Sequence, residues 1–265
     1  MRLLNKVLND NQNNSLSFVS YITAGDPDIS TSLKIMEKLV ENGVGIIELG
    51  IPFSDPISDG PTIQKASERA LKNKITIDDV LKLIKKFREK YQTPIILFGY
   101  YNPFLKYGLD KLMKKIKDAG ADGILVVDLP PEESEIIQKS VDRVNLELIY
   151  LLAPTSTKYR IKTISKLSNS FIYLVSVTGV TGARKELDKN LYPFIEKIRK
   201  STNKPICVGF GISKPDHVKK LKNKANGIVI GSAFIKIIEE NLHNKKDILN
   251  KISKFTKKIY KSTKI

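Results

Sequence analysis

The feature that most constrains the fold is a regular alternation of short apolar runs with longer amphipathic segments. The segments between the runs carry apolar residues at helical spacing, as in Leu33, Met36 and Val40. Such alternation predicts parallel strands joined by right-handed helical crossovers, and eight repeats close a (β/α)8 TIM barrel. The eight expected strands are 16–22, 44–49, 94–100, 123–128, 146–152, 171–175, 205–209 and 227–230.

Two further segments lie outside the eight repeats. Residues 3–8 predict an extra N-terminal helix, and the spacing of Ile248, Ile252 and Ile259 predicts an extra C-terminal helix packed on the outside of the barrel. A chain of 265 residues can form one such barrel, so we expect a single catalytic domain over residues 1–265. Because the sequence contains neither a bilayer-length apolar run nor the apolar core of a signal peptide, we expect a cytoplasmic protein.

The formal net charge of +17 raises the question of an acidic partner. The lysines are scattered through helical segments, as at Lys82, Lys85 and Lys86, without interleaved aromatic residues or a nucleic-acid-binding motif. We therefore expect neither nucleic acid nor a membrane as a partner. The charge could still attract a phosphorylated substrate, an effect that salt would screen.

Two carboxylates surround a rigid turn directly after the second expected strand. Glu48 lies at the end of this strand, and Asp59 follows in a loop whose prolines and glycines prevent helix and strand until Pro61. Burying a carboxylate in an apolar strand is costly unless it is paired or neutral, so Glu48 is a candidate acid/base group. Two structural alternatives stay open, namely a buried ion pair for Glu48 and an N-cap role for Asp59.

The other strand ends narrow the chemistry, because active sites of such barrels lie at the C-terminal ends of the strands. No lysine is expected there, which argues against a Schiff-base aldolase. The histidines, His217 and His243, lie in helical or tail segments as expected surface residues, so we expect no metal site. Cys207 lies in an apolar run as a buried structural thiol. The remaining chemistry is acid/base catalysis by carboxylates, without a metal or a cofactor in this chain.

Glycines after the last two expected strands predict a phosphate site. Segment 209–213 follows the seventh strand, and segment 231–234 follows the eighth and opens a helix. Glycine lets backbone N–H groups approach an anion, and the dipole of a helix N-terminus stabilises it. A third glycine segment, 178–184, has the composition of a polar loop of the lid type.

Together these segments resemble the tryptophan synthase alpha chain family. The resemblance rests on 25–27, on E-L-G-I-P-F-S-D-P at 48–56, on 59–64, on G-V-T-G at 179–182, and on 209–212 and 231–233. It implies a barrel that cleaves indole-3-glycerol phosphate to indole and glyceraldehyde 3-phosphate by a retro-aldol step. It also implies a beta-chain partner that carries pyridoxal phosphate, in an α2β2 heterotetramer that makes tryptophan.

The resemblance assigns roles to individual residues. It places the catalytic pair on Glu48 and Asp59, with Glu48 as acid and then base and Asp59 as the anion that stabilises the indole N–H, and it adds Tyr173 as the active-site tyrosine. The phosphate site falls on Gly182, Gly211, Gly231 and Ser232. The substrate contacts fall on Tyr21, Ile63, Phe98, Tyr100, Leu125, Thr181 and Phe210. The expected partner interface includes Asp55 and Pro56.

Some positions depart from the family pattern, and other functions stay possible. Tyr21 and Phe98 stand where phenylalanine and leucine are expected, and Arg184 and Lys185 make the loop after Gly182 unusually basic. The alternatives are a stand-alone indole-3-glycerol-phosphate lyase, another phosphate-binding barrel enzyme, and an inactive barrel kept as a structural subunit. Intact Glu48 and Asp59 argue against the last.

Overall fold

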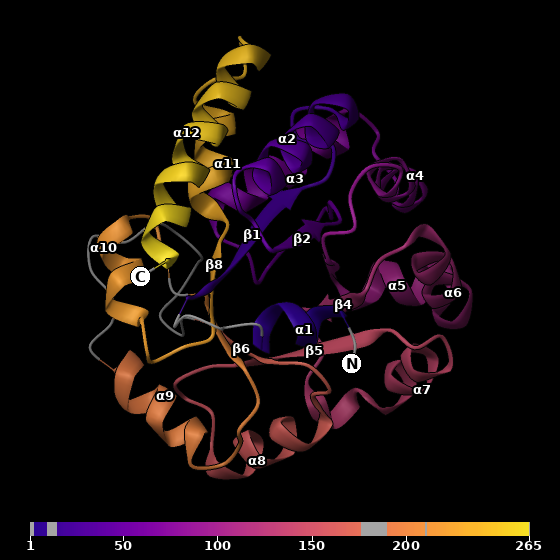
Figure 1. Cartoon of the computed structure of the whole chain (residues 1–265). Helices are drawn as coiled ribbons and strands as arrows, with labels where there is room; N and C mark the ends of the chain where they lie inside the picture. The colour runs from indigo at the N-terminus through magenta and orange to yellow at the C-terminus, as the bar shows by residue number, and fades with distance from the viewer. Residues whose placement is uncertain (1–2, 10–14, 176–189, 210, 265) are drawn as a thin grey trace.

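The fold is known from a computed structural model that describes residues 3–9, 15–175, 190–209 and 211–264. Eight parallel strands form a closed barrel in sequence order, as the alternation predicts (Figure 1). The ring closes where Ser17 of β1 lies opposite Gly227 of β8. The strands are β1 (Ser17–Thr23), β2 (Ile46–Gly50), β3 (Ile95–Gly99), β4 (Gly123–Val126), β5 (Glu147–Leu152), β6 (Ile172–Val175), β7 (Ile206–Gly209) and β8 (Gly227–Ile230).

The helices surround the barrel and bury their apolar faces against it. They are α2 (Ile29–Glu41), α3 (Pro61–Lys72), α4 (Ile77–Arg88), α5 (Tyr101–Tyr107), α6 (Leu109–Ala119), α7 (Glu135–Arg143), α8 (Lys158–Leu167), α9 (Leu191–Arg199), α10 (Pro215–Leu221) and α11 (Ser232–Glu239), with a 3-10 turn, η1 (Pro131–Glu133). Within the residues that the structure describes, no helix is long and apolar enough to cross a membrane.

Both extra helices are present. Helix α12 (Lys245–Thr263) packs outside the barrel against α2 and α10, with Ile248, Ile252 and Ile259 fully buried. Helix α1 (Leu3–Asn9) lies within the ring of outer helices in Figure 1. Its buried Leu4 and Leu8 belong to the cluster of inward-facing strand residues, so α1 closes one end of the barrel with apolar side chains.

Most strands begin one or two residues later than expected from the sequence. At β2 the cause is the preceding helix. The backbone N–H of Val44 donates to the carbonyl of Leu39, so Val44 completes the end of α2 and does not join the sheet. At the other end of the neighbouring strands, Tyr100 is the N-cap of α5, and Asp128 accepts a hydrogen bond from the backbone N–H of Tyr101 (2.8 Å). These two residues therefore leave the sheet and form the loops above it.

Candidate active site

Glu48 lies in the interior of the barrel and is fully buried. Its neighbours in the sheet are Tyr21 of β1 and Ile96 of β3. The Tyr173 hydroxyl donates to Oε2 of Glu48 (3.3 Å), whereas Oε1 has no hydrogen-bond partner among the described residues. Burial raises the pKa of Glu48 to about 8, although the hydrogen bond from Tyr173 acts in the opposite direction. Glu48 is therefore a neutral carboxylic acid near pH 7.

Asp59 lies in the loop between β2 and α3, where its backbone N–H donates to the carbonyl of Pro56 (3.0 Å). The Tyr100 hydroxyl donates to Oδ2 of Asp59 (3.0 Å). The side chain is buried, since Asp59 is only 4% exposed. Burial raises the pKa of Asp59 to about 6, partly offset by Tyr100. Asp59 is thus ionised at neutral pH while Glu48 is protonated.

Among the described residues, neither structural alternative for these carboxylates is observed. Glu48 forms no ion pair with any described residue, and its contact is the neutral hydroxyl of Tyr173. Asp59 does not cap α3, because Gly60 occupies the N-cap position and no side-chain bond caps this helix.

Aromatic side chains surround the two carboxylates. The Tyr21 and Phe98 rings meet edge to face with centroids 5.2 Å apart. Tyr21 is near enough to Asp59, Tyr100 and Glu48 for all three to raise the pKa of its hydroxyl, after the larger effect of burial. An aromatic wall next to an acid and an anion suits a flat, apolar ring that must be protonated.

The described residues among the other expected substrate contacts belong to the two apolar clusters of the barrel. Phe98, Leu125 and Tyr173 belong to the inward-facing cluster, and Ile63 belongs to the main apolar cluster together with Tyr21. Thr181 and Phe210 lie outside the described residues, so their placement stays a prediction.

The expected phosphate site lies where β7 and β8 run side by side, with Val208 opposite Ile228. Gly211 has a φ of 66°, a backbone conformation that favours glycine. Gly231 is the N-cap residue of α11, and a Cβ there would lie 3.2 Å from Cβ of Tyr21. Ser232 begins the helix, so free N–H groups occur at the end of β8. Gly182 lies outside the described residues.

Asp55 is exposed and Pro56 is half-buried in the loop above the barrel. The next residue, Ile57, is 83% exposed and was not identified from the sequence. The sequence did contain a signal, because an isoleucine between Pro56 and Ser58 in a loop that cannot form helix or strand has no obvious place in the core.

Two other residues differ in how well the sequence predicted them. Cys207 is fully buried as expected, and it lies close enough to Glu48 for that carboxylate to add to the effect of burial in raising the thiol pKa. His217 is only 3% exposed, so its expected surface position was wrong: it belongs to the inner face of α10 with Val218 and Leu221. Across the described ranges, no group of three or more potential metal ligands comes together.

Comparisons with known proteins point to one family. A family model described as "Tryptophan synthase alpha chain" matches residues 7–264. The tryptophan synthase alpha chain of Geotalea uraniireducens is 47% identical over 227 residues, which cover 86% of this chain and 85% of that protein. Tryptophan synthase subunit alpha from Legionella pneumophila superposes with a TM-score of 0.92 at 35% identity, covering 99% and 98% of the two chains.

A second solved structure comes from an assembly. It was determined in a study of mutual activation in the tryptophan synthase α2β2 complex of Pyrococcus furiosus. A chain of that structure matches this chain with a TM-score of 0.85. The two sequences are 38% identical, and the match covers 93% of this chain and 98% of the other.

Proposed function

The chain belongs to the tryptophan synthase alpha chain family, and from this membership and the site geometry we propose that it is a carbon–carbon lyase whose catalytic pair is Glu48 and Asp59. Its function is that of the alpha subunit of tryptophan synthase, the retro-aldol cleavage of indole-3-glycerol phosphate to indole and glyceraldehyde 3-phosphate. The observation that carries the residue assignment is the buried, neutral carboxyl group of Glu48, which accepts a hydrogen bond from Tyr173 at one oxygen and has no hydrogen-bond partner among the described residues at the other.

The proposed reaction begins with protonation of the indole ring. Indole is a poor leaving group until its C3 atom is protonated, and neutral Glu48 supplies that proton. The protonated ring carries positive charge at its N–H, which ionised Asp59 stabilises. The bond between C3 and the glycerol chain then breaks, and its electron pair returns to the ring. The carboxylate of Glu48 accepts the proton of the glycerol hydroxyl as the aldehyde forms, so the acid is regenerated.

Tyr173 and Tyr100 have supporting roles in this proposal. Each donates its hydroxyl hydrogen to one carboxylate of the pair, Tyr173 to Glu48 and Tyr100 to Asp59. These bonds fix the carboxyl planes and hold each pKa below the value that burial alone would set. We propose that Tyr21, Ile63, Phe98, Leu125, Thr181 and Phe210 complete the indole site, and that Gly182, Gly211, Gly231 and Ser232 bind the phosphate.

We also propose a beta-chain partner, which would hold the pyridoxal phosphate and convert indole to tryptophan in an α2β2 heterotetramer in the cytoplasm. Exposed apolar side chains on the catalytic face support the docking site. Four of the large apolar residues exposed in the described chain follow the ends of β2, β3, β4 and β5, and so lie at the face where the strands end. They are Ile57 (83% exposed), Leu105 (52%), Ile136 (64%) and Tyr159 (73%). Together with Asp55 and Pro56, the two residues expected at the interface, they form the partner interface that we propose.

A product assay tests the activity. The purified chain is given indole-3-glycerol phosphate, and indole and glyceraldehyde 3-phosphate are measured separately. We expect equal amounts of the two products, without added metal or cofactor. A chain that binds the substrate and releases no indole would refute the proposed catalytic pair. Equal rates with and without a cognate beta chain would instead favour a stand-alone lyase.

A further inference from the structure

The backbone of Asp59 is held by helix α3. The side-chain Nε2 of Gln64, in the first turns of that helix, donates to the carbonyl oxygen of Asp59 (2.9 Å) and lies 3.4 Å from that of Pro56. Tyr100 holds the Asp59 carboxylate but belongs to the loop after β3. The position of the Asp59 backbone therefore depends on where α3 lies.

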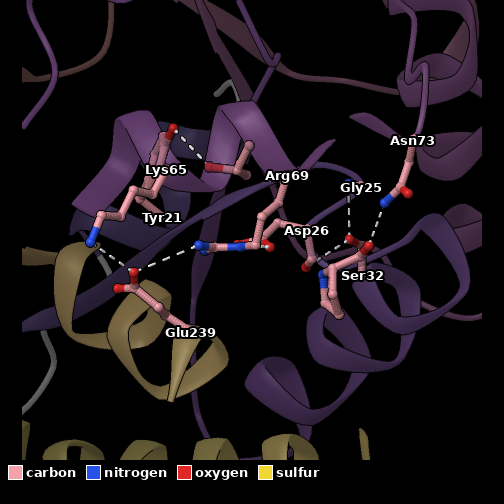
Figure 2. Close-up of polar contacts among 10 residues, drawn as sticks. Tyr21, Gly25, Asp26, Ser32, Lys65, Arg69, Asn73 and Glu239 are labelled. Carbon is pink, nitrogen blue, oxygen red and sulfur yellow. Dashed lines mark hydrogen bonds and ion pairs between the residues drawn. The ribbon is translucent and has the colours of Figure 1, made fainter. Parts of the chain in front are cut away.

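Helix α3 is in turn fixed to the loop after β1 by a buried ion pair. Nε of Arg69 donates to Oδ1 of Asp26 (2.7 Å), and a terminal nitrogen donates to Oδ2 (2.8 Å). The Asp26 side chain is fully buried, and that of Arg69 is 17% exposed. Figure 2 shows the Arg69 guanidinium between Asp26 and Glu239 of α11. Two parallel bonds to one carboxylate fix both distance and orientation, which a single contact does not.

The loop that carries Asp26 is itself well supported. The backbone N–H of Gly25 donates to Oγ of Ser32 in α2 (3.0 Å), and Nδ2 of Asn73, at the end of α3, donates to the carbonyl of Pro27 (2.6 Å). Helix α3 thus contacts this loop at two positions, Arg69 and Asn73, and both are visible in Figure 2. The loop forms a fixed support at the edge of the barrel.

The contacts of Glu239 are weaker by comparison. Arg69 approaches Glu239 only to 3.9 Å, and Lys65 approaches it to 3.2 Å with a side chain that is 60% exposed. Exposed ion pairs of this kind contribute little. Lys65 lies on the same helix between Gln64 and Arg69, yet it contacts neither Asp26 nor the Asp59 loop, which makes it a matched control.

We propose that Asp26 and Arg69 are positioning residues for Asp59, acting through helix α3 and Gln64. The inference rests on the proposed function of Asp59 as the anion that stabilises the protonated indole ring. None of the three linking side chains needs to touch the substrate. Their effect is to hold the Asp59 carboxylate where positive charge develops during the reaction.

The expected signature is kinetic. Charge stabilisation that occurs only in the transition state affects kcat, whereas uniform binding of substrate affects KM. A displacement of about 1 Å in a catalytic group can cost roughly 100-fold in rate. A helix that shifts only partly should cost less, so we expect kcat to fall about tenfold on loss of either link, with KM within twofold of wild type.

The experiment compares Arg69→Lys, Gln64→Ala and the double variant with Lys65→Ala as the control, in the full chain. Arg69→Lys keeps the positive charge beside Asp26 but cannot form the two parallel bonds. Because both residues act along one path, Arg69→Lys should not lower kcat further in a chain that already carries Gln64→Ala. Independent effects of the two substitutions on kcat would instead multiply. Lys65→Ala should keep the wild-type kcat and KM.

Hydrogen exchange measured by mass spectrometry over residues 54–60 gives a second readout that does not need activity. We expect faster exchange there in Arg69→Lys and Gln64→Ala, and wild-type exchange in Lys65→Ala. Wild-type kcat and exchange in both single variants, equal losses in the Lys65 control, or multiplicative losses in the double variant would each overturn the proposal. If Arg69→Lys fails to fold, the kcat and exchange of Gln64→Ala decide.

The two readouts also separate this inference from the function on which it rests. A wild-type chain that releases no indole would overturn the proposed function, while the exchange measurements would still report whether Arg69 and Gln64 hold the loop. If the wild-type chain releases indole and the Arg69→Lys variant has the same kcat and hydrogen exchange as wild type, only the positioning role is overturned.

Discussion

The hydroxyl of Tyr173 donates to Oε2 of Glu48 across 3.3 Å, and the other oxygen of this buried carboxyl group has no hydrogen-bond partner among the described residues. A neutral carboxyl group held in this way can carry its proton on the free oxygen, Oε1. A proton on Oε1 is not shared with the protein and can be given to a substrate. The arrangement also determines how the activity should respond to pH.

The pH dependence of kcat/KM should be bell-shaped. Glu48 must be protonated to act as the acid, so activity should fall as pH rises through its pKa of about 8. Asp59 must be ionised, so activity should also fall as pH drops through its pKa of about 6. The measurement is the initial rate of indole release at low substrate concentration from about pH 4 to about pH 10, roughly two units beyond each expected pKa; such a profile of kcat/KM reports groups of the free enzyme.

Tyr173→Phe assigns the alkaline limb of this profile. The Tyr173 hydrogen bond lowers the pKa of Glu48 against the larger effect of burial, so its removal should raise that pKa and move the alkaline limb to higher pH. The acid limb should stay in place, because Tyr173 does not contact Asp59. An alkaline limb that does not move would mean that another group titrates there.

Glu48→Gln should lose nearly all activity and gain stability at high pH. General acid–base catalysis typically contributes about 10²–10⁴-fold, so kcat should fall by a factor in this range. The folded pKa of about 8 lies above the ordinary 4.5, so the folded protein binds the proton more tightly, and wild-type stability falls as pH rises between these values. Neutral glutamine avoids this loss.

The size of the stability gain follows from the pKa shift. A shift from 4.5 to about 8 corresponds to roughly 3–5 kcal/mol at pH above 8 and to little below 4.5. Urea unfolding of both proteins at pH 5 and pH 9 measures it. A variant with activity within a few-fold of wild type would refute the role of Glu48, and equal stability at pH 9 would refute its raised pKa.

Asp59→Asn should lower kcat far more than it raises KM. Its negative charge acts mainly when the indole nitrogen becomes positive, so the loss belongs to the transition state and should reach about 10²–10³-fold in kcat. Steady-state kinetics of indole release measure both constants, with Asp118→Asn as a control at an exposed carboxylate paired to Lys114. A large rise in KM with kcat unchanged would make Asp59 a ground-state binding group.

The barrel could be predicted from the sequence because eight apolar runs at regular spacing have few other ways to bury themselves. The residues at which the strands begin and end could not be predicted, because they depend on which backbone partner wins a single hydrogen bond. Val44, for example, bonds to Leu39 at the end of α2 and does not join the sheet. Glu48 could be recognised because a carboxylate in an apolar strand is out of place. Its raised pKa follows from the same burial.

The contacts that organise the site were not predictable in the same way. Tyr100 and Asp59 are 41 positions apart, and Arg69 and Asp26 are 43 apart. No local pattern joins such pairs, because each depends on how two loops at the end of the barrel approach one another. For the same reason the sequence of the Asp59 loop did not show that Tyr100 would bond its carboxylate or that Gln64 would bond its backbone carbonyl.

Ser232→Asp should weaken substrate binding while leaving the fold intact. Aspartate in the first turn of α11 is favourable for the helix, because it lies near the positive end of the helix dipole, but it places a negative charge at the proposed phosphate site. It avoids the strain that a side chain would cause at Gly211, with its φ of 66°. We expect a rise in KM of at least about tenfold, since each factor of ten corresponds to about 1.4 kcal/mol. Ser232→Asn is the neutral control, and an equal KM in both variants would place the phosphate elsewhere.

The last prediction concerns the partner and rests on Ile57, the most exposed of the apolar residues on the catalytic face. Ile57 lies between Asp55 and Asp59 on one loop, so a protein that covers Ile57 also contacts the loop that carries the catalytic anion. Burying an isoleucine side chain typically contributes about 1.5–3 kcal/mol, and Ile57→Asp should therefore weaken beta-chain binding by at least about tenfold.

The effect of Ile57→Asp on the isolated chain should be small, because the side chain is in solvent. Leu3→Asp is the matched control, since Leu3 is 39% exposed and belongs to α1, whose Leu4 and Leu8 lie beside the first residues of β4 and β8, at the end of the barrel away from Ile57. Titration of each variant with a cognate beta chain, followed by the rate of indole release, measures the effect. We expect the wild type and Leu3→Asp to be accelerated at the same beta-chain concentration, and Ile57→Asp to need at least about ten times more. Identical titrations for Ile57→Asp and wild type would place the interface away from this loop.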